Sequence, residues 1–243
     1  MKPILILQHQ TAEHPAYLKH WLEIRDYNYQ IFNAGAGDEF PASIEPYSAL
    51  AVLGGGMSAN DPLLSNRQAE ILILQAMRLD RPVIGHCLGG QLMTRALGGS
   101  IGPSPSPEIG WQPIDYADDP LVEYWFGDRP TPQVIQWHYE SFSIPQGAVL
   151  LASSRACPNQ AWALGRKFLA MQFHIEINQT KAHEWAADTD AKWDQARARY
   201  DSVQTSQQII EGVDQYLDQH LKTADHIYQT WLKPTIWANY LST

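Results

Sequence analysis

A single turn around Cys87 limits the fold more than any other feature of the chain. Residues 82–93 place a short apolar strand, Gly85, Cys87 and Gly89 directly before a helical pattern. This Gly-x-Cys-x-Gly form is the cysteine version of a nucleophile elbow, a strained strand-to-helix turn that small residues make room for. The turn exposes the sulfur at a strand end and aims a helix N-terminus at it, which favours a thiolate and a nearby oxyanion. We therefore expect Cys87 to act in covalent catalysis.

Upstream of this turn, strands alternate with helices. Short apolar runs indicate buried strands, and apolar residues at helical spacing indicate the connecting helices. The predicted strands are residues 4–8, 27–33 and 49–53, and the predicted helices are residues 15–25 and 69–79. This alternation predicts a parallel sheet with right-handed crossovers, in which ligands bind at the carboxyl ends of the strands. The triplet Gly54, Gly55 and Gly56 and the residue Cys87 are both expected at that edge.

The pattern changes after Gly102. Pro103, Pro105 and Pro107 predict a loop, and the short apolar runs that follow indicate an antiparallel or mixed part of the sheet. These runs are residues 110–114, 133–137, 149–152, 160–164 and 168–173. From Gln179 onward the sequence is helical and amphipathic. We therefore predict two segments, a main domain over 1–178 and a helical extension over 179–243 that packs on it.

Composition excludes several classes of protein. The 243 residues suit one sizeable α/β domain with or without an extension, and the formal charge of −9, with no basic stripe, argues against a nucleic-acid partner. No stretch is long and apolar enough to suggest a membrane span, and the N-terminal apolar run is too short for a signal peptide. Two cysteines, Cys87 and Cys157, make no disulfide framework, so a reducing cytoplasm is the expected location, and Cys157, next to Pro158 in a turn, is expected to be a structural or incidental thiol.

A nucleophilic thiol needs a base and a group that orients the base. The run 169–176 reads as a strand that ends at His174, and Glu176 follows two residues later on the same side. A carboxylate there accepts the imidazole N–H and leaves the other ring nitrogen to face Cys87. The glycine triplet and the N–H of Leu88 are the expected oxyanion donors. Each feature alone is weak, but together they are hard to explain as chance.

At this point the chain resembles a class I (triad-type) glutamine amidotransferase domain, in the stand-alone branch similar to the glutaminase part of GMP synthase. The resemblance runs from Ile4 to about Glu176. Its most specific pieces are the glycine loop at 53–61, the elbow at 85–91, Glu-Ile-Gly-Trp at 108–111, Trp-His-Tyr-Glu-Ser-Phe at 137–142 and Gln-Phe-His-Ile-Glu at 172–176.

The resemblance implies a flavodoxin-like three-layer α/β fold with a central mixed, mostly parallel sheet and a C-terminal helical extension. It also implies hydrolysis of the glutamine side-chain amide through a γ-glutamyl thioester, with release of ammonia. The implied residues are the triad Cys87, His174 and Glu176, the oxyanion contacts Gly55, Gly56 and Leu88, and the substrate contacts Gln91, Trp137 and His138. No cofactor is expected, because the spacings of a zinc site and of a phosphate-binding P-loop are absent.

Three positions depart from the family pattern. Gly56 stands where proline is usual, His86 replaces an apolar residue, and Gly90 often has a histidine or alanine counterpart. The first change is expected to loosen the oxyanion loop without removing its donors. We interpret His86 as a tolerated residue beside the elbow; the alternative is that it alters the pKa of the thiol.

Several readings remain open. The ammonia acceptor belongs to a separate synthase subunit, or the protein is a γ-glutamyl peptidase or hydrolase that acts alone. A dienelactone-hydrolase type of enzyme fits the elbow but not the late His-x-Glu pair, and a non-catalytic regulatory module or thiol sensor fits poorly with a complete triad. We expect Trp111, Trp125 and Trp137 to be core or pocket wall. The C-terminal helices are expected to pack on the domain; alternatively they cover the active site or form a homodimer contact.

Overall fold

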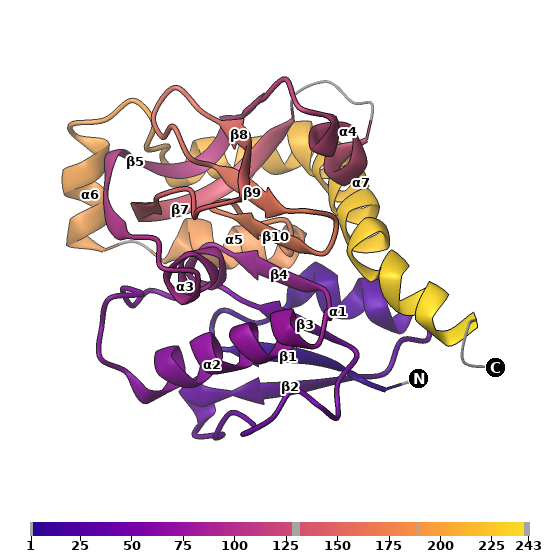
Figure 1. The fold of residues 1–243 in the computed structure, drawn as a ribbon. Coiled ribbons are helices and arrows are strands. Elements are labelled where there is room, and N and C mark those ends of the chain that lie inside the picture. The colour runs from indigo at the N-terminus through magenta and orange to yellow at the C-terminus, as the bar shows by residue number, and fades with distance from the viewer. Residues whose placement is uncertain (1, 128–131, 189, 241–243) are drawn as a thin grey trace.

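The computed structural model describes residues 2–127, 132–188 and 190–240, and a central eight-stranded sheet organises them (Figure 1). Its strand order is β2-β1-β3-β4-β10-β9-β8-β6. The strands are β1 (Ile4–Gln8), β2 (Tyr29–Asn33), β3 (Ala49–Val52), β4 (Val83–His86), β6 (Asp115–Tyr116), β8 (Val149–Ser153), β9 (Ala161–Leu164) and β10 (Phe168–Met171). The pairs from β2 to β10 are parallel, whereas β9, β8 and β6 continue the sheet antiparallel. This confirms the predicted mixed, mostly parallel sheet.

Helices cover both faces of the sheet, as Figure 1 shows. They are α1 (Ala16–Glu23), η1 (Ala34–Ala36), α2 (Leu64–Arg78), α3 (Leu88–Ala96), α4 (Pro120–Phe126), α5 (Gln179–Ala187), α6 (Ala191–Arg197) and α7 (Ser206–Tyr240). Helices α2 and α3 share one buried cluster with the sheet, and α1, α4 and α7 share the cluster on the opposite face. Within the described part of the chain, no helix has the length and apolar character needed to cross a membrane.

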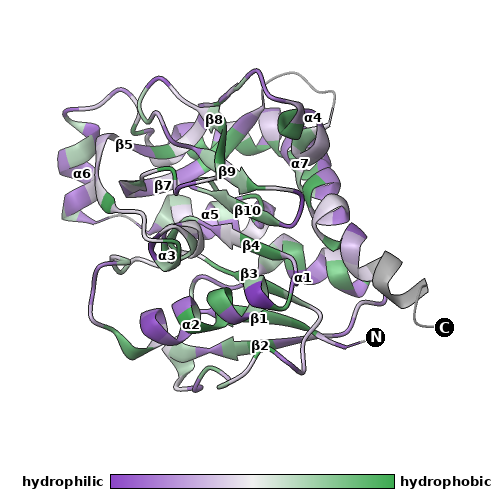
Figure 2. Cartoon of the chain, viewed as in Figure 1, coloured by the Kyte–Doolittle hydropathy of each residue, from purple (hydrophilic) through white to green (hydrophobic). Residues whose placement is uncertain are grey.

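Strand residues alternate between these two clusters, because side chains along a strand point to opposite faces. In β1, Ile4 and Ile6 pack on the α1 and α7 side, while Leu5 and Leu7 pack on the α2 and α3 side. All four are at most 1% exposed. The central strands β1, β3 and β4 are accordingly among the most hydrophobic parts of the ribbon in Figure 2. Burial on both faces explains why the sequence shows these strands as short, continuous apolar runs.

A separate two-stranded sheet corrects one expectation. Strand β5 (Ile101–Pro113) pairs antiparallel with β7 (Gln133–Phe142), so Pro103, Pro105 and Pro107 lie in a strand and the predicted loop is wrong. The register shifts between Pro103 and Glu108, which marks a bulge. Proline is tolerated there because a strand of a two-stranded sheet has an edge whose N–H groups need no ladder partner. This sheet packs against α5, α6 and the start of α7 through a third buried cluster.

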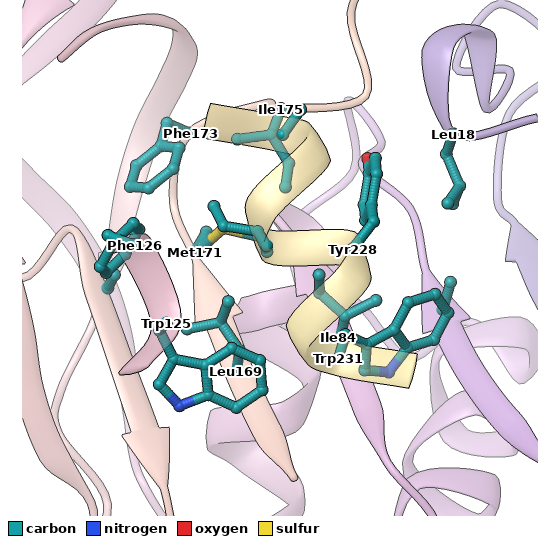
Figure 3. Packing of buried hydrophobic residues seen from close by; sticks show 14 of the residues in the cluster. Leu18, Ile84, Trp125, Phe126, Leu169, Met171, Phe173, Ile175, Tyr228 and Trp231 are labelled. Carbon is teal, nitrogen blue, oxygen red and sulfur yellow. The ribbon is translucent and has the colours of Figure 1, made fainter. Parts of the chain in front are cut away.

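The C-terminal helical segment is as long as the sequence indicates, but it is part of the core. Helix α5 begins at Gln179, and α7 contributes Ala224, Ile227, Tyr228, Trp231 and Leu232 to the main buried cluster (Figure 3). The division of the chain at residue 178 stays a prediction. Trp111 and Trp125 are fully buried, in line with the interpretation as core residues.

Candidate active site

The elbow is a strained turn between β4 and α3. Cys87 has φ 49° and ψ −108°, a conformation that is rare for a residue with a side chain and that clusters at functional sites. Its backbone N–H donates to the Met171 carbonyl oxygen at 2.8 Å, which ties the turn to the end of β10. The side chain is only 5% exposed and lies at the N-terminus of α3. The structure therefore holds the thiol where a helix dipole favours negative charge.

Two of the elbow glycines are required by close packing. A Cβ on Gly89 would lie 2.0 Å from the Val52 carbonyl oxygen, and a Cβ on Gly85 would lie 2.6 Å from the Gly89 carbonyl carbon. Both distances are far shorter than a nonbonded contact allows, so α3 approaches β3 and β4 this closely only because these side chains are absent.

His174 and Glu176 meet beside this turn. Strand β10 ends at Met171, earlier than the sequence indicates, and the His174 N–H instead donates to the Ile135 carbonyl oxygen of β7 at 3.0 Å. Nδ1 of His174 lies 2.7 Å from Oε1 of Glu176. That contact assigns the Nδ1 proton to the Glu176 bond and leaves Nε2 for the thiol. Both side chains are almost completely buried.

The charges of this pair shift both pKa values. Burial alone would lower the pKa of His174, but the Glu176 carboxylate and the Cys87 sulfur outweigh it and raise the pKa to about 10. Burial would raise the pKa of Glu176, but the positive charge of His174 and its hydrogen bond outweigh burial and hold that pKa well below its usual range. The pair is therefore ionised at neutral pH.

His86 lies directly behind the pair. It is completely buried, and Nε2 lies 3.9 Å from Oε2 of Glu176 and 3.4 Å from the Tyr228 hydroxyl of α7. Burial lowers the pKa of His86, although Glu176 opposes the shift. The backbone carbonyl of Glu176 also accepts from the Tyr17 N–H at 2.7 Å. Elements far apart in sequence thus surround the carboxylate.

The glycine loop lies against Cys87 and His174. A Cβ on Gly54 would be 2.8 Å from Cε1 of His174 and 3.7 Å from Cβ of Cys87, so this glycine packs directly on both. Gly55 borders the same cavity. The N–H of Gly56, however, donates to Oε1 of Gln10 at 2.7 Å. Of the two loop donors expected for an oxyanion, the Gly56 N–H is therefore already engaged by a side chain that the sequence did not single out.

Two connected cavities meet at Cys87. The larger, of about 670 Å³, is bordered by Cys87, His174, Trp185 and the loop around Glu13. The smaller, of about 340 Å³, is bordered by Cys87 and by the predicted substrate contacts Gln91, Trp137 and His138. Gly55, Gly56, Cys87 and Trp137 border both cavities. Cys87 therefore lies between two spaces, each large enough to hold part of a small molecule.

Several residues of these cavities were missed by sequence reasoning. Nε2 of Gln172 lies 3.4 Å from the Cys87 sulfur, and the Trp185 ring stands edge-on to the His174 ring with centroids 4.7 Å apart. Asp190 and Lys192 supply opposite charges to the smaller cavity. Gln172 stands in a motif already quoted, but Trp185, Asp190 and Lys192 come from the helical segment, where no local pattern distinguishes them from other residues of amphipathic helices.

A second polar cluster lies behind the smaller cavity. Glu108 accepts from the Ser154 hydroxyl at 2.7 Å and from the Gln160 side-chain amide, and it lies 3.1 Å from Nε2 of His138. Ligand atoms of Glu108, His138 and Cys157 lie within 4.8 Å of one another, a set that is able to hold a metal ion. Both carboxylate oxygens of Glu108 accept hydrogen bonds, so these bonds explain why the three side chains lie together, and a metal ion is not needed to explain it. Burial raises the pKa of Cys157, consistent with an inert thiol.

We expect Glu176→Gln to destabilise the fold most at mildly acidic pH. Glu176 has a folded pKa below its ordinary 4.5, so its contribution is full above pH 4.5 and is lost as the pH falls. His174 has a raised pKa, so its contribution is full below pH 6.5 and is lost as the pH rises through about 10. Urea unfolding of both proteins at pH 5.5 and pH 9.5 measures the effect. A destabilisation that is equal at the two values would contradict the ionised pair.

The fold and the site together define a class of protein, an α/β scaffold with a cysteine elbow, a buried His–Glu pair and a glycine loop at the carboxyl edge of its sheet. The family model of class-I glutamine amidotransferases matches residues 16–189. The chain belongs to this family. It is 35% identical over 171 residues to the putative glutamine amidotransferase-like protein YfeJ of Salmonella typhimurium, covering 67% of this chain and 70% of that one.

Other relatives share parts of the chain. The match to a GMP synthase of Bacillus pumilus is 34% identical and covers 47% of this chain but only 24% of the synthase. Gamma-glutamyl peptidase 3 of Arabidopsis thaliana is 34% identical over 42% of this chain and 43% of its own length. A crystal structure of a glutamine amidotransferase from Methylobacillus flagellatus superimposes with a TM-score of 0.89 at 33% identity, over 96% of this chain and 95% of that one.

Proposed function

We propose that the protein hydrolyses the side-chain amide of glutamine or of a γ-glutamyl compound with Cys87 as nucleophile, His174 as acid and base, and Glu176 as the group that orients His174. The carrying observation is the convergence of the strained Cys87 turn with the 2.7 Å contact between His174 and Glu176 at one cavity. Family membership and the presence of GMP synthases and a γ-glutamyl peptidase among the relatives support this proposal.

The reaction follows from the positions of these groups. The thiolate adds to the amide carbonyl carbon, and the resulting oxyanion is expected next to the N–H groups of Gly55 and Leu88. His174 gives its Nε2 proton to the amide nitrogen, the C–N bond breaks, and ammonia or an amine leaves a γ-glutamyl thioester on Cys87. Water that gives a proton to His174 then attacks the thioester, releases glutamate and restores the thiol.

The smaller cavity suits the amino-acid end of the substrate. It contains the predicted contacts Gln91, Trp137 and His138, and it adds Asp190 and Lys192. A zwitterion needs one anionic and one cationic neighbour, so we propose that Asp190 contacts the α-ammonium group and Lys192 the α-carboxylate. We also propose two protein partners: a separate synthase subunit that receives the ammonia, and a second copy of the chain in a homodimer.

Selective labelling tests the proposal. A glutamine analogue that carries a chloroketone in place of the side-chain amide should add once to the protein, at Cys87, at neutral pH. Cys157 is an internal control, because it is fully buried and burial raises its pKa. Peptide mapping by mass spectrometry locates the adduct. If Cys87 is not labelled, or if excess glutamine does not slow its labelling, the result would favour a non-catalytic regulatory module.

A further inference from the structure

The larger cavity lies on the side of Cys87 from which the leaving group departs. In the reaction proposed above, the group that protonates the amide nitrogen must lie beside that nitrogen. His174 borders the larger cavity, and it is not among the residues that border the smaller one. With the amino-acid end in the smaller cavity, whatever is attached to the amide nitrogen must therefore extend into the larger cavity.

The size of this cavity exceeds what glutamine requires. Ammonia is about as large as a water molecule, which takes up about 30 Å³ in the liquid. The cavity measures about 670 Å³, which lies within the range of small-molecule sites. A site that released only ammonia would need a small fraction of this space.

The wall of the cavity is a built structure. The buried side chain of Gln8 donates to the carbonyl oxygens of Gln10 at 3.0 Å and of Thr11 at 2.9 Å, which fixes the loop after β1. Lys181 of α5 is only 1% exposed, and its ammonium group donates to the His14 carbonyl oxygen at 2.8 Å and lies 3.1 Å from Oε2 of Glu13. These bonds hold the loop against α5 and keep the cavity open.

Away from Cys87 and His174, the charged side chains of the described lining are acidic. Glu13 and Asp188 border the cavity, and no lysine or arginine does so among the residues the structure describes there. Lys181 partly neutralises Glu13 from behind. Asp188 is exposed and is the C-cap residue of α5, an end of the helix where the dipole disfavours negative charge. Within residues 2–127, 132–188 and 190–240, its carboxylate has no ion-pair or hydrogen-bond partner, so its placement does not serve the stability of the helix.

We propose, on the basis of the function proposed above, that the preferred substrate is a γ-glutamyl amide of an aliphatic amine that carries a second positive charge. The γ-glutamyl part occupies the smaller cavity and the amine part the larger one. The distal cation lies near Asp188 and Glu13, and the edges of Trp137 and Trp185 contact its alkyl chain. Cleavage transfers the His174 proton to the amide nitrogen and releases the free amine, and water completes the hydrolysis of the thioester.

Four amides test this proposal with the intact protein. They are glutamine and the γ-glutamyl amides of 1,3-diaminopropane, of butylamine and of 4-aminobutanoate, the last three differing only in a terminal ammonium, methyl or carboxylate group. We expect kcat/KM for the ammonium-ended amide to be about fivefold higher than for the methyl-ended amide, and to exceed kcat/KM for the carboxylate-ended amide by a larger factor. The fivefold figure corresponds to the attraction between a cation and a solvent-accessible carboxylate. This preference should fall at 0.5 M salt.

A matched pair of variants assigns the preference to the cavity. Asp188→Asn should reduce the ratio of kcat/KM for the ammonium-ended amide to that for the methyl-ended amide to about two or less, because the variant loses the attraction of one exposed charge pair. Asp218→Asn removes the same charge from the exposed face of α7, beside Lys222, and should leave the ratio as it is.

The outcomes separate the two proposals. The proposed substrate class would be overturned if glutamine were hydrolysed faster than all three longer amides, or if the terminal charge had no effect on the rate. Either result would leave the proposed triad in place. It would point to the larger cavity as a docking face for a synthase subunit. No turnover of any amide, together with an unlabelled Cys87, would overturn the proposed function and the substrate class with it.

Discussion

Cys87→Ala should abolish amide hydrolysis and leave the protein folded. Alanine removes the only atom on the elbow that forms the thioester, and loss of a catalytic nucleophile typically costs about 10⁴-fold or more in kcat. The fold should tolerate the change, because sulfur is a weak hydrogen-bonding atom and its contacts, such as 3.4 Å to Nε2 of Gln172 and 3.9 Å to the Trp137 carbonyl oxygen, contribute little to stability. Release of glutamate from glutamine or a γ-glutamyl amide measures activity, and a thermal unfolding curve measures the fold.

The second cysteine supplies the control for this experiment. Cys157→Ala should keep turnover within about twofold, because a buried thiol outside the reacting groups contributes packing and not chemistry. Turnover that persists in Cys87→Ala, or that disappears in Cys157→Ala with the fold intact, would refute the assignment of the nucleophile.

The sequence predicted the half of the fold that depends on local pattern. The strand at residues 4–8 is β1 with the same bounds, because a strand buried on both faces is a continuous apolar run that needs no partner to be recognised. Helix α2 begins at Leu64, five residues before the predicted start. Leu64 is exposed and the residues at 65–68 are polar, so apolar periodicity does not mark the first turn.

What the sequence could not predict depends on contacts between distant segments. The prolines at 103–107 lie in a strand because β7, some 30 residues later, pairs with β5 on both sides of a bulge. A run of alternating prolines carries no signal for that partner. The same holds for α4, a short helix over Pro120–Phe126 that the apolar pattern did not indicate.

The candidate site divides in the same way. Cys87, His174 and Glu176 could be proposed from sequence because turn chemistry and strand alternation fix their local geometry. Cys87 and His174 border one cavity, and Glu176 lies behind His174 at hydrogen-bond distance. The engagement of the Gly56 N–H by Gln10 could not be predicted, since it joins the loop after β1 to the loop after β3. Nor could the contact of His86 with Tyr228, which crosses 142 residues of sequence.

Helix α7 leads to the second large effect, because its inner face completes the core beside His86 and Glu176. Trp231 is fully buried, and its ring lies 6.4 Å from that of Tyr228, in the cluster that also contains Ile84 and Leu169 (Figure 3). Trp231→Ala should reduce the free energy of unfolding by about 3–5 kcal/mol, the usual range for removal of a buried tryptophan. A loss of this size approaches the total stability of many domains.

Ile210→Ala is the matched control for this change. Ile210 lies on the same helix but is 40% exposed, and a surface substitution of this kind usually changes stability by no more than about 0.5 kcal/mol. Urea unfolding of both variants and of a chain truncated after residue 178 tests whether the extension is part of the core. We expect the truncated chain to remain unfolded, because the sheet face that α1 and α4 share with α7 would be left exposed to water. The opposite conclusion, that residues 1–178 fold independently, would follow if the truncated chain unfolded cooperatively and Trp231→Ala were no less stable than Ile210→Ala.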